Sequence, residues 1–396
     1  MPDPRLIQRL FGVGGLQVDS TGFPSQIRVE HGLLSRLPEL FQQALLQDIG
    51  QLADRYRGPL SFGRGLRSPQ TFDSQANAAG LLQLGLTVFF QDVSGTLPGA
   101  VPFLRELERE LGVVEGSARL SAFASPEDDG VSCHYDAEEV ISIQLVGKKT
   151  FYVAPMTEIE RPYGAQFGPD MVAVENLFEQ ARQGFPDACG VTFERHEMLA
   201  GSVLFLPRGT WHRTEALEPS LALSIVIRPP VLADAVLRWL KPWLLGDARW
   251  RLPLYGKADP QDTGLNVLLG ELATRLSREA DTPSLSWNSA PSVDTTELLR
   301  IPGSGLTWQE LPTSGQSAPR LRLQGTALDQ DWRERLTLDT EIPGLLLPAL
   351  GWLQQCSRAF DLDAISEHLP HIARSDLRQL LDLLVKSHVL RQLVQR

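Results

Sequence analysis

The chain has 396 residues and a formal net charge of −11 at pH 7, with 42% hydrophobic and 21% charged residues. This is the composition of a globular protein with a large core. The acidic balance argues against a protein that coats nucleic acid or an anionic membrane, because Lys and Arg dominate phosphate binding. Three cysteines and no CxxC pair argue against a disulfide framework or a structural zinc site. Since neither a signal peptide nor a membrane helix is predicted, we expect a cytoplasmic protein.

The first hundred residues mix helical and extended patterns. Apolar residues at helical spacing predict helices over residues 34–52 and 101–111. Short apolar stretches at residues 59–62 and 86–90 predict strands.

Residues 117–229 carry short apolar runs separated by turn residues, the pattern of an antiparallel β sandwich or barrel. A long insertion at residues 162–195 interrupts the pattern, and we expect it to be helical over residues 172–183.

A Pro-Pro pair at residues 229–230 predicts a boundary, beyond which the pattern becomes helical. Leu- and Trp-rich helices are predicted over residues 231–245 and 264–280, and a linker or loops over the Ser-, Pro- and Gly-rich residues 281–320. The remainder predicts a small winged-helix-like module, with strands at 321–323, 336–338 and 389–393 and helices at 346–357, 362–369 and 374–387.

His134 and Asp136 lie just before the predicted strand at residues 139–146. Residues two apart on an extended chain face the same side, so both side chains can reach one ion. An imidazole and a carboxylate are two of the three ligands in the facial triad of non-haem Fe(II). An HxD pair also occurs in ordinary surface loops, so a third ligand is needed.

Residues 201–212 fit the second cupin motif, GxxxxxPxGxxH, and supply that ligand. Gly201 turns the chain into a strand, Pro207 and Gly209 end the strand, and His212 starts the next one pointing back into the barrel. Ala216 stands where small cupins carry an Asn.

Residues 134–151 resemble the JmjC-type, cupin-fold 2-oxoglutarate oxygenases, whose pattern is approximately HYD-x-x-x-V-x-x-x-Q-x-x-G-x-(K/R)-x-W. Only the last position differs, with Phe151 in place of Trp. Within this group the chain is most similar to the ribosomal oxygenases, which hydroxylate ribosomal proteins. The resemblance implies a double-stranded β-helix (jelly roll) over residues 1–230, a helical dimerisation segment over 231–285 and a winged-helix-like α+β domain over 286–396.

Carried over by position, the resemblance implies Fe(II) bound by His134, Asp136 and His212, with 2-oxoglutarate and dioxygen as cosubstrates. Lys149 would pair with the distal carboxylate of 2-oxoglutarate. Strand parity agrees, because Lys149 shares a face with Phe151, and a lysine among apolar neighbours needs an anionic partner.

Further cosubstrate candidates are Ser121 and Phe123, where the family often has Asn and Tyr, and Ser224, where it has a hydroxyl residue. Four residues are candidates for the substrate pocket. By strand parity, Gln144 and Glu138 share a face with Asp136. Arg208 and Trp211 flank His212 in the sequence. We therefore expect these four side chains to face the substrate.

The implied reaction is oxidative decarboxylation of 2-oxoglutarate to succinate and carbon dioxide, coupled to hydroxylation of a C–H bond. We expect a protein or peptide hydroxylase, with ribosomal proteins as favoured substrates. We also expect it to act as a homodimer without direct nucleic-acid binding. Three alternatives stay open: a tailoring hydroxylase of a modified peptide or small natural product, a lysine demethylase, and a cupin-fold binding protein without turnover.

Overall fold

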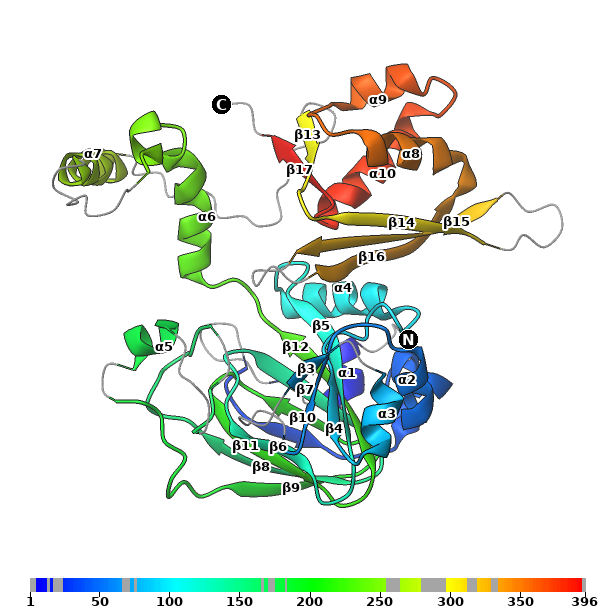
Figure 1. Ribbon diagram of the computed structural model, residues 1–396, viewed down its shortest axis with the longest axis vertical. Coiled ribbons are helices and arrows are strands. Elements are labelled where there is room, and N and C mark those ends of the chain that lie inside the picture. Colours follow the sequence, from blue (N-terminus) through cyan, green and yellow to red (C-terminus); the bar gives the residue numbers. More distant parts are fainter. Residues whose placement is uncertain are drawn as a thin grey trace. The chain divides into compact units, whose positions relative to one another are not determined.

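The computed structural model describes residues 5–12, 15–16, 24–65, 72–74, 77–164, 167–169, 175–181, 184–253, 264–278, 297–311, 319–328 and 334–393. The chain forms two compact units, one of residues 1–228 with 291–396 and one of residues 229–290 (Figure 1). The three-part division expected from the sequence stays a prediction. Within the described ranges, no helix is both long enough and apolar enough to cross a membrane.

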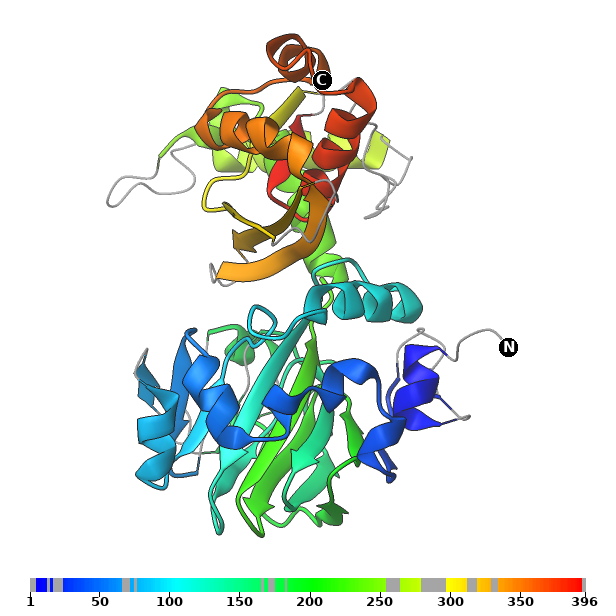
Figure 2. The same cartoon turned by 90° about the vertical axis from the view of Figure 1, so that its right-hand side faces the viewer.

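Short helices and 3₁₀ turns of the N-terminal segment pack on one face of a large sheet (Figure 2). The helix predicted over residues 34–52 is wrong for most of its length, because Pro38 interrupts it and only 3₁₀ turns form before Ile49. The Asp48 carboxylate then caps α2 by accepting from the Gly50 and Gln51 N–H groups. The helices are α1 (Leu6–Phe11), α2 (Ile49–Arg55), α3 (Ala78–Gln83) and α4 (Ala100–Leu111), and the 3₁₀ turns are Leu34–Arg36, Glu39–Gln42 and Ala44–Leu46.

The β core predicted from the sequence is confirmed as two antiparallel sheets. The larger has the order β1-β10-β7-β12-β5-β4-β2-β3 and the smaller the order β6-β11-β8-β9. The large-sheet strands are β1 (Arg28–Glu30), β2 (Leu60–Gly63), β3 (Phe72–Ser74), β4 (Thr87–Phe90), β5 (Ala118–Ser125), β7 (Glu139–Val146), β10 (Val203–Leu206) and β12 (Ser220–Ile227). The small-sheet strands are β6 (Gly130–His134), β8 (Lys149–Pro155), β9 (Glu194–Met198) and β11 (Thr210–Ala216), and α5 (Glu175–Gln180) lies between β8 and β9.

Strand β12 separates the apolar core from the space between the sheets. Alternate residues such as Leu223 and Ile225 belong to the core formed with the N-terminal helices. Their neighbours Ser224 and Val226 line a cavity on the opposite face. Every residue of β12 is buried, so the period-two alternation divides core from cavity rather than core from solvent.

Phe41 ties the irregular N-terminal segment to this core. Its side chain is fully buried, and its ring packs edge-on against Phe103 with 5.2 Å between centroids. We expect Phe41→Ala to lower the free energy of unfolding by about 3–5 kcal/mol, since a large cavity would remain. Urea unfolding followed by circular dichroism measures this change. Leu33→Ala is the control, because Leu33 is 76% exposed and its loss should change stability by less than about 0.5 kcal/mol. Equal effects of the two substitutions would contradict the prediction.

Residues 297–393 build a second apolar core around three helices. Strand β13 (Glu297–Arg300) pairs with β17 (Leu390–Leu393), and β14 (Gly305–Glu310), β15 (Arg320–Leu328) and β16 (Glu334–Pro343) form a separate sheet beside α8 (Leu347–Gln355), α9 (Leu362–His368) and α10 (Arg374–Lys386). The loops predicted over residues 281–320 are therefore wrong for β13 and β14, where Leu298 and Leu306 are buried. Residues 279–296 lie outside the described residues. The winged-helix-like classification stays a prediction.

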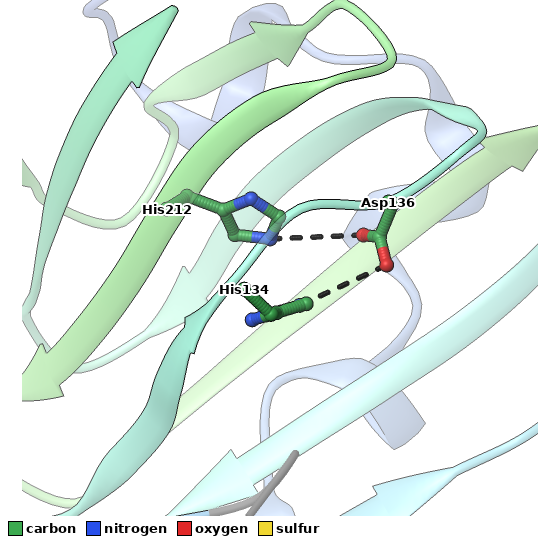
Figure 3. Close-up of side chains that lie close together, drawn as sticks. All are labelled: His134, Asp136 and His212. Carbon is green, nitrogen blue, oxygen red and sulfur yellow. Dashed lines mark ion pairs between the residues drawn. The ribbon is translucent and has the colours of Figure 1, made fainter. Parts of the chain in front are cut away.

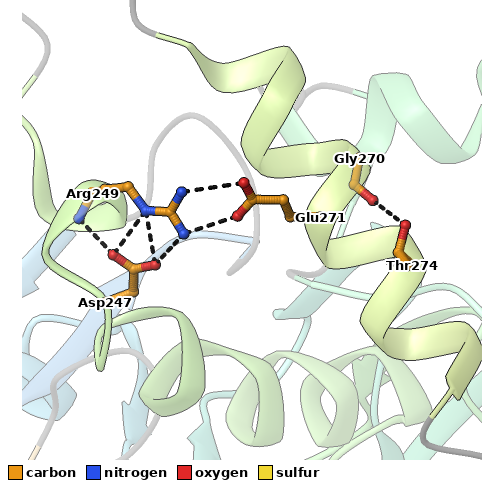
Figure 4. A network of polar contacts seen from close by, with 5 residues as sticks. All are labelled: Asp247, Arg249, Gly270, Glu271 and Thr274. Atoms are coloured by element: carbon orange, nitrogen blue, oxygen red, sulfur yellow. Dashed lines mark hydrogen bonds and ion pairs between the residues drawn. The ribbon is translucent and has the colours of Figure 1, made fainter.

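The unit of residues 229–290 contains the two helices predicted there, α6 (Leu232–Leu244) and α7 (Leu265–Arg278). Arg249, in the turn after α6, pairs with Asp247 at 2.7 Å and with Glu271 of α7 at 2.8 Å (Figure 4). The exposed pair of Arg249 with Glu271 links the turn to α7. Helix α6 leaves Leu232 and Leu237 exposed, and the predicted dimerisation through these helices stays a prediction.

Candidate metal and cosubstrate site

The small sheet brings the three predicted metal ligands together. His134 of β6 and His212 of β11 are directly paired across the two antiparallel strands. Asp136 follows β6 and places its Oδ1 3.7 Å from His134 Nε2 and its Oδ2 3.6 Å from His212 Nε2 (Figure 3). One ligand atom from each of the three residues lies within 4.8 Å of the other two. An ion about 2.1 Å from each ligand could contact all three atoms after small movements.

Backbone carbonyls orient both imidazole rings. His134 Nδ1 lies 2.7 Å from the Ser132 carbonyl oxygen, and His212 Nδ1 lies 2.9 Å from the Thr210 carbonyl oxygen. A carbonyl only accepts hydrogen bonds, so Nδ1 of each ring is the donor and Nε2 faces Asp136. This arrangement is typical of metal-ligating histidines. Two neutral imidazoles and one carboxylate fit Fe(II) and leave coordination positions open.

A cavity between the two sheets contains the triad. Aromatic and aliphatic side chains form much of its wall, which limits the access of water. The Phe123 ring, expected at the cosubstrate, lines this cavity and stacks on Phe89 with 4.4 Å between centroids. The other apolar wall residues include Val131, Val140, Phe151 and Leu206.

Three hydroxyl groups cross the large sheet beside the metal ligands. Ser224 of β12 is paired with Ser121 of β5 on one side and with Ser142 of β7 on the other, and all three line the cavity. The Ser121 Oγ is buried without a hydrogen-bond partner in the described part of the protein. Strand parity counted from Asp136 places Ser142 on the inward face, where it is found, although only Ser121 and Ser224 were predicted at the cosubstrate.

Lys149 is the buried cation of the cavity. Its side chain is 1% exposed, and Nζ donates to Ser125 Oγ at 3.2 Å. Burial lowers the pKa of Lys149 to about 8, and the Asp129 carboxylate partly opposes this shift. Within the described ranges its ammonium forms no ion pair, so an anionic ligand would satisfy it.

Gly147 forms the turn that leads from β7 into Lys149. Its φ is +69°, and a Cβ at this position would lie 2.2 Å from the Pro219 carbonyl oxygen. Only glycine fits this turn without displacement of the neighbouring backbone.

Glu138 lines the cavity as expected, but two arginines already hold its carboxylate. Arg119 Nη2 lies 3.3 Å from Glu138 and Arg228 Nη1 lies 3.6 Å away. Arg119 also lines the cavity and was not singled out from the sequence. This wall therefore offers guanidinium donors as well as a carboxylate acceptor.

Three residues expected in the substrate pocket do not line the cavity. Trp211 is fully buried behind the small sheet, edge-on against Tyr135. Gln144 is 1% exposed, and its Nε2 donates to the Val146 carbonyl. Arg208 forms a buried ion pair with Glu139. Trp211 directly precedes His212 on β11, and adjacent residues of a strand point to opposite faces, so flanking the metal ligand in sequence does not bring Trp211 into the pocket.

Residues 105–235 match the family model described as the JmjC domain. The uncharacterized protein YxbC of Bacillus subtilis (strain 168) is 26% identical over 219 residues, which cover 53% of this chain and 65% of YxbC. The match thus spans slightly less than two thirds of that relative.

Solved structures of the ribosomal oxygenase YcfD from Escherichia coli, in complex with cobalt and 2-oxoglutarate or with cobalt and succinic acid, are 17% identical in sequence. Each comparison covers 87% of this chain and 89% of YcfD, with a TM-score of 0.40. The segment matched by the JmjC model contains His134, Asp136, His212 and Lys149. Residues 105–235 are thus similar to the JmjC domain, the cupin-fold domain of oxygenases that use Fe(II), 2-oxoglutarate and dioxygen.

Proposed function

We propose that this protein is an Fe(II)- and 2-oxoglutarate-dependent oxygenase that hydroxylates an amino-acid side chain of a protein or peptide. The observation that carries the proposal is the triad of His134, Asp136 and His212, whose donor atoms face one another inside a cavity that also holds Lys149. A metal triad and a buried cation that forms no ion pair in the described part of the chain are the two features that a chelating dicarboxylate requires.

The residues of the cavity have distinct roles in this reaction. Bound Fe(II) would supply the activation of dioxygen that drives oxidative decarboxylation of 2-oxoglutarate and oxidation of a substrate C–H bond. Lys149 holds the distal carboxylate of the cosubstrate, and the hydroxyls of Ser121 and Ser224 donate hydrogen bonds beside it. Phe151 and the stacked Phe89 exclude water from the reacting centre.

The charged wall of the cavity supports a peptide substrate. Arg119 supplies N–H donors and Glu138 supplies an acceptor, which match the carbonyl and N–H of a peptide backbone. The net charge of −11 suits a basic protein partner. Ribosomal proteins, which are basic and are the substrates of the resembled enzymes, are therefore the first substrates to test.

The proposal predicts succinate formation coupled to addition of one oxygen atom to a protein. Purified protein with Fe(II) and 2-oxoglutarate is incubated in air with a cell extract, and intact ribosomal proteins are weighed by mass spectrometry. We expect a mass gain of one oxygen that is lost when 2-oxoglutarate is omitted. Absence of succinate, together with absence of a visible charge-transfer band on anaerobic titration with Fe(II) and 2-oxoglutarate, would refute the proposed chemistry.

The apolar part of the cavity favours a second candidate, a tailoring hydroxylase of a small natural product. The stacked Phe89 and Phe123 rings form a flat surface that suits an aromatic or aliphatic ligand. In the same experiment this function would give succinate and an oxygenated small molecule, with every protein mass unchanged.

A further inference from the structure

We infer that Glu139 and Arg208 are positioning residues that fix the distance between the two chain segments carrying the metal ligands. The inference rests on the proposed metal site and adds two residues outside the cavity lining to its machinery. Glu139 begins β7, three residues after Asp136. Arg208 lies in the turn between β10 and β11, four residues before His212.

The two side chains form a fork-shaped ion pair. Arg208 Nε donates to Glu139 Oε1, and Arg208 Nη2 donates to Glu139 Oε2 at 2.8 Å. The Glu139 side chain is 4% exposed and the Arg208 side chain 16%. Two parallel hydrogen bonds define the orientation as well as the separation of the partners. The pair therefore sets the position of one segment against the other more closely than a single contact would.

The Glu139–Arg208 ion pair joins β7 to the segment after β10 at the point where the backbone hydrogen bonds between these two strands end. The pairing of β10 with β7 ends at Leu206 and Val140. The next residue of the chain, Pro207, has no N–H to donate to a further ladder bond. Beyond it, the Gly209 N–H donates to the Asp136 carbonyl at 2.8 Å. A side-chain contact and a backbone contact thus join the Asp136 segment to the His212 segment.

A contribution to folding stability does not by itself explain why the protein has this buried ion pair. Desolvation of two buried charges offsets most of their attraction, and apolar residues of similar volume often replace them without loss of stability. Outer-shell contacts of this kind instead hold metal ligands in place, and their loss typically weakens metal binding about 10–100-fold.

The test measures Co(II) binding to the full-length protein under anaerobic conditions. The variants are Glu139→Gln, which keeps the shape but removes the charge, and the double variant Glu139→Leu with Arg208→Met, which replaces the pair with apolar side chains. We expect both to bind Co(II) about 10–100-fold more weakly and to show a changed visible Co(II) spectrum. The double variant should keep a thermal midpoint close to that of the wild type.

Glu108→Gln is the matched control. Glu108 forms a comparably buried pair with Arg105, on helix α4 and away from the ligand segments. This control should lose thermal stability but keep wild-type Co(II) affinity and spectrum. The inference is overturned if the Glu139 variants only lose stability, as Glu108→Gln does, and bind Co(II) as the wild type does. Failure of the wild-type protein to bind Co(II) would instead refute the proposed metal site.

Discussion

His212→Ala should abolish metal-dependent turnover and weaken Co(II) binding by more than the roughly 100-fold that loss of an outer-shell contact costs. The substitution removes one of three donor atoms, and the loss leaves His134 and Asp136 as a two-ligand site. Folding should persist, because His212 lies at the cavity rather than in the apolar core. Titration with Co(II), monitored by its visible absorption, and succinate production measure the two effects.

His196→Ala is the control for this substitution. His196 lies on β9 of the same small sheet, and its Nε2 is 3.3 Å from Glu194 Oε1. It does not line the cavity, so its loss should leave Co(II) affinity unchanged. Wild-type metal affinity and turnover in His212→Ala would show that the triad is not the metal site.

Lys149→Met should weaken 2-oxoglutarate binding at least about 30-fold while leaving Co(II) affinity unchanged. Loss of one partner of a buried charge pair costs about 2–5 kcal/mol, and about 1.4 kcal/mol corresponds to a factor of ten. Titration of the Co(II)-loaded protein with 2-oxoglutarate measures the effect. Lys148→Met is a close control, because the adjacent Lys148 pairs with Glu197 and its side chain is 32% exposed. Equal affinities of the two variants would show that another cation binds the cosubstrate.

The same lysine should make cosubstrate binding depend on pH. Burial lowers the Lys149 pKa from 10.5 to about 8, with Asp129 opposing the shift, so above pH 8 the free protein loses the proton that the distal carboxylate requires. We expect 2-oxoglutarate affinity to fall by up to about tenfold per pH unit above this value. In Lys149→Arg the guanidinium stays charged, and the affinity should be nearly constant over the same range.

The folding free energy should respond to this lysine in the opposite direction. Between pH 8 and pH 10.5 the unfolded chain holds a proton on Lys149 that the free folded protein has released. Without cosubstrate, the cost of burying the charge is therefore present below pH 8 and relieved as the pH rises through this window. Urea unfolding at pH 7.5 and pH 9.5, compared with Lys149→Met, isolates the contribution of this residue.

Local patterns in the sequence were sufficient to predict the strands around the site and the face on which their side chains lie. The alternation along β12 and the spacing of His134 and Asp136 depend only on the two-residue period of an extended chain. The same period placed Lys149 and Phe151 on the cavity face. Gln144 keeps this parity, since it pairs with the cavity-lining Ala222, but its side chain donates to the Val146 carbonyl and does not line the cavity.

The sequence by itself predicted the chemical type of the candidate metal ligands and that His134 and Asp136 face the same side. Tertiary structure alone decided which groups meet there. The pairing of His212 with His134 across β11 and β6 creates the site, whereas Arg208 turned from a candidate substrate contact into the partner of Glu139. The physical reason is that backbone geometry sets the direction of a side chain locally, but the charge or surface it contacts comes from segments distant in the chain.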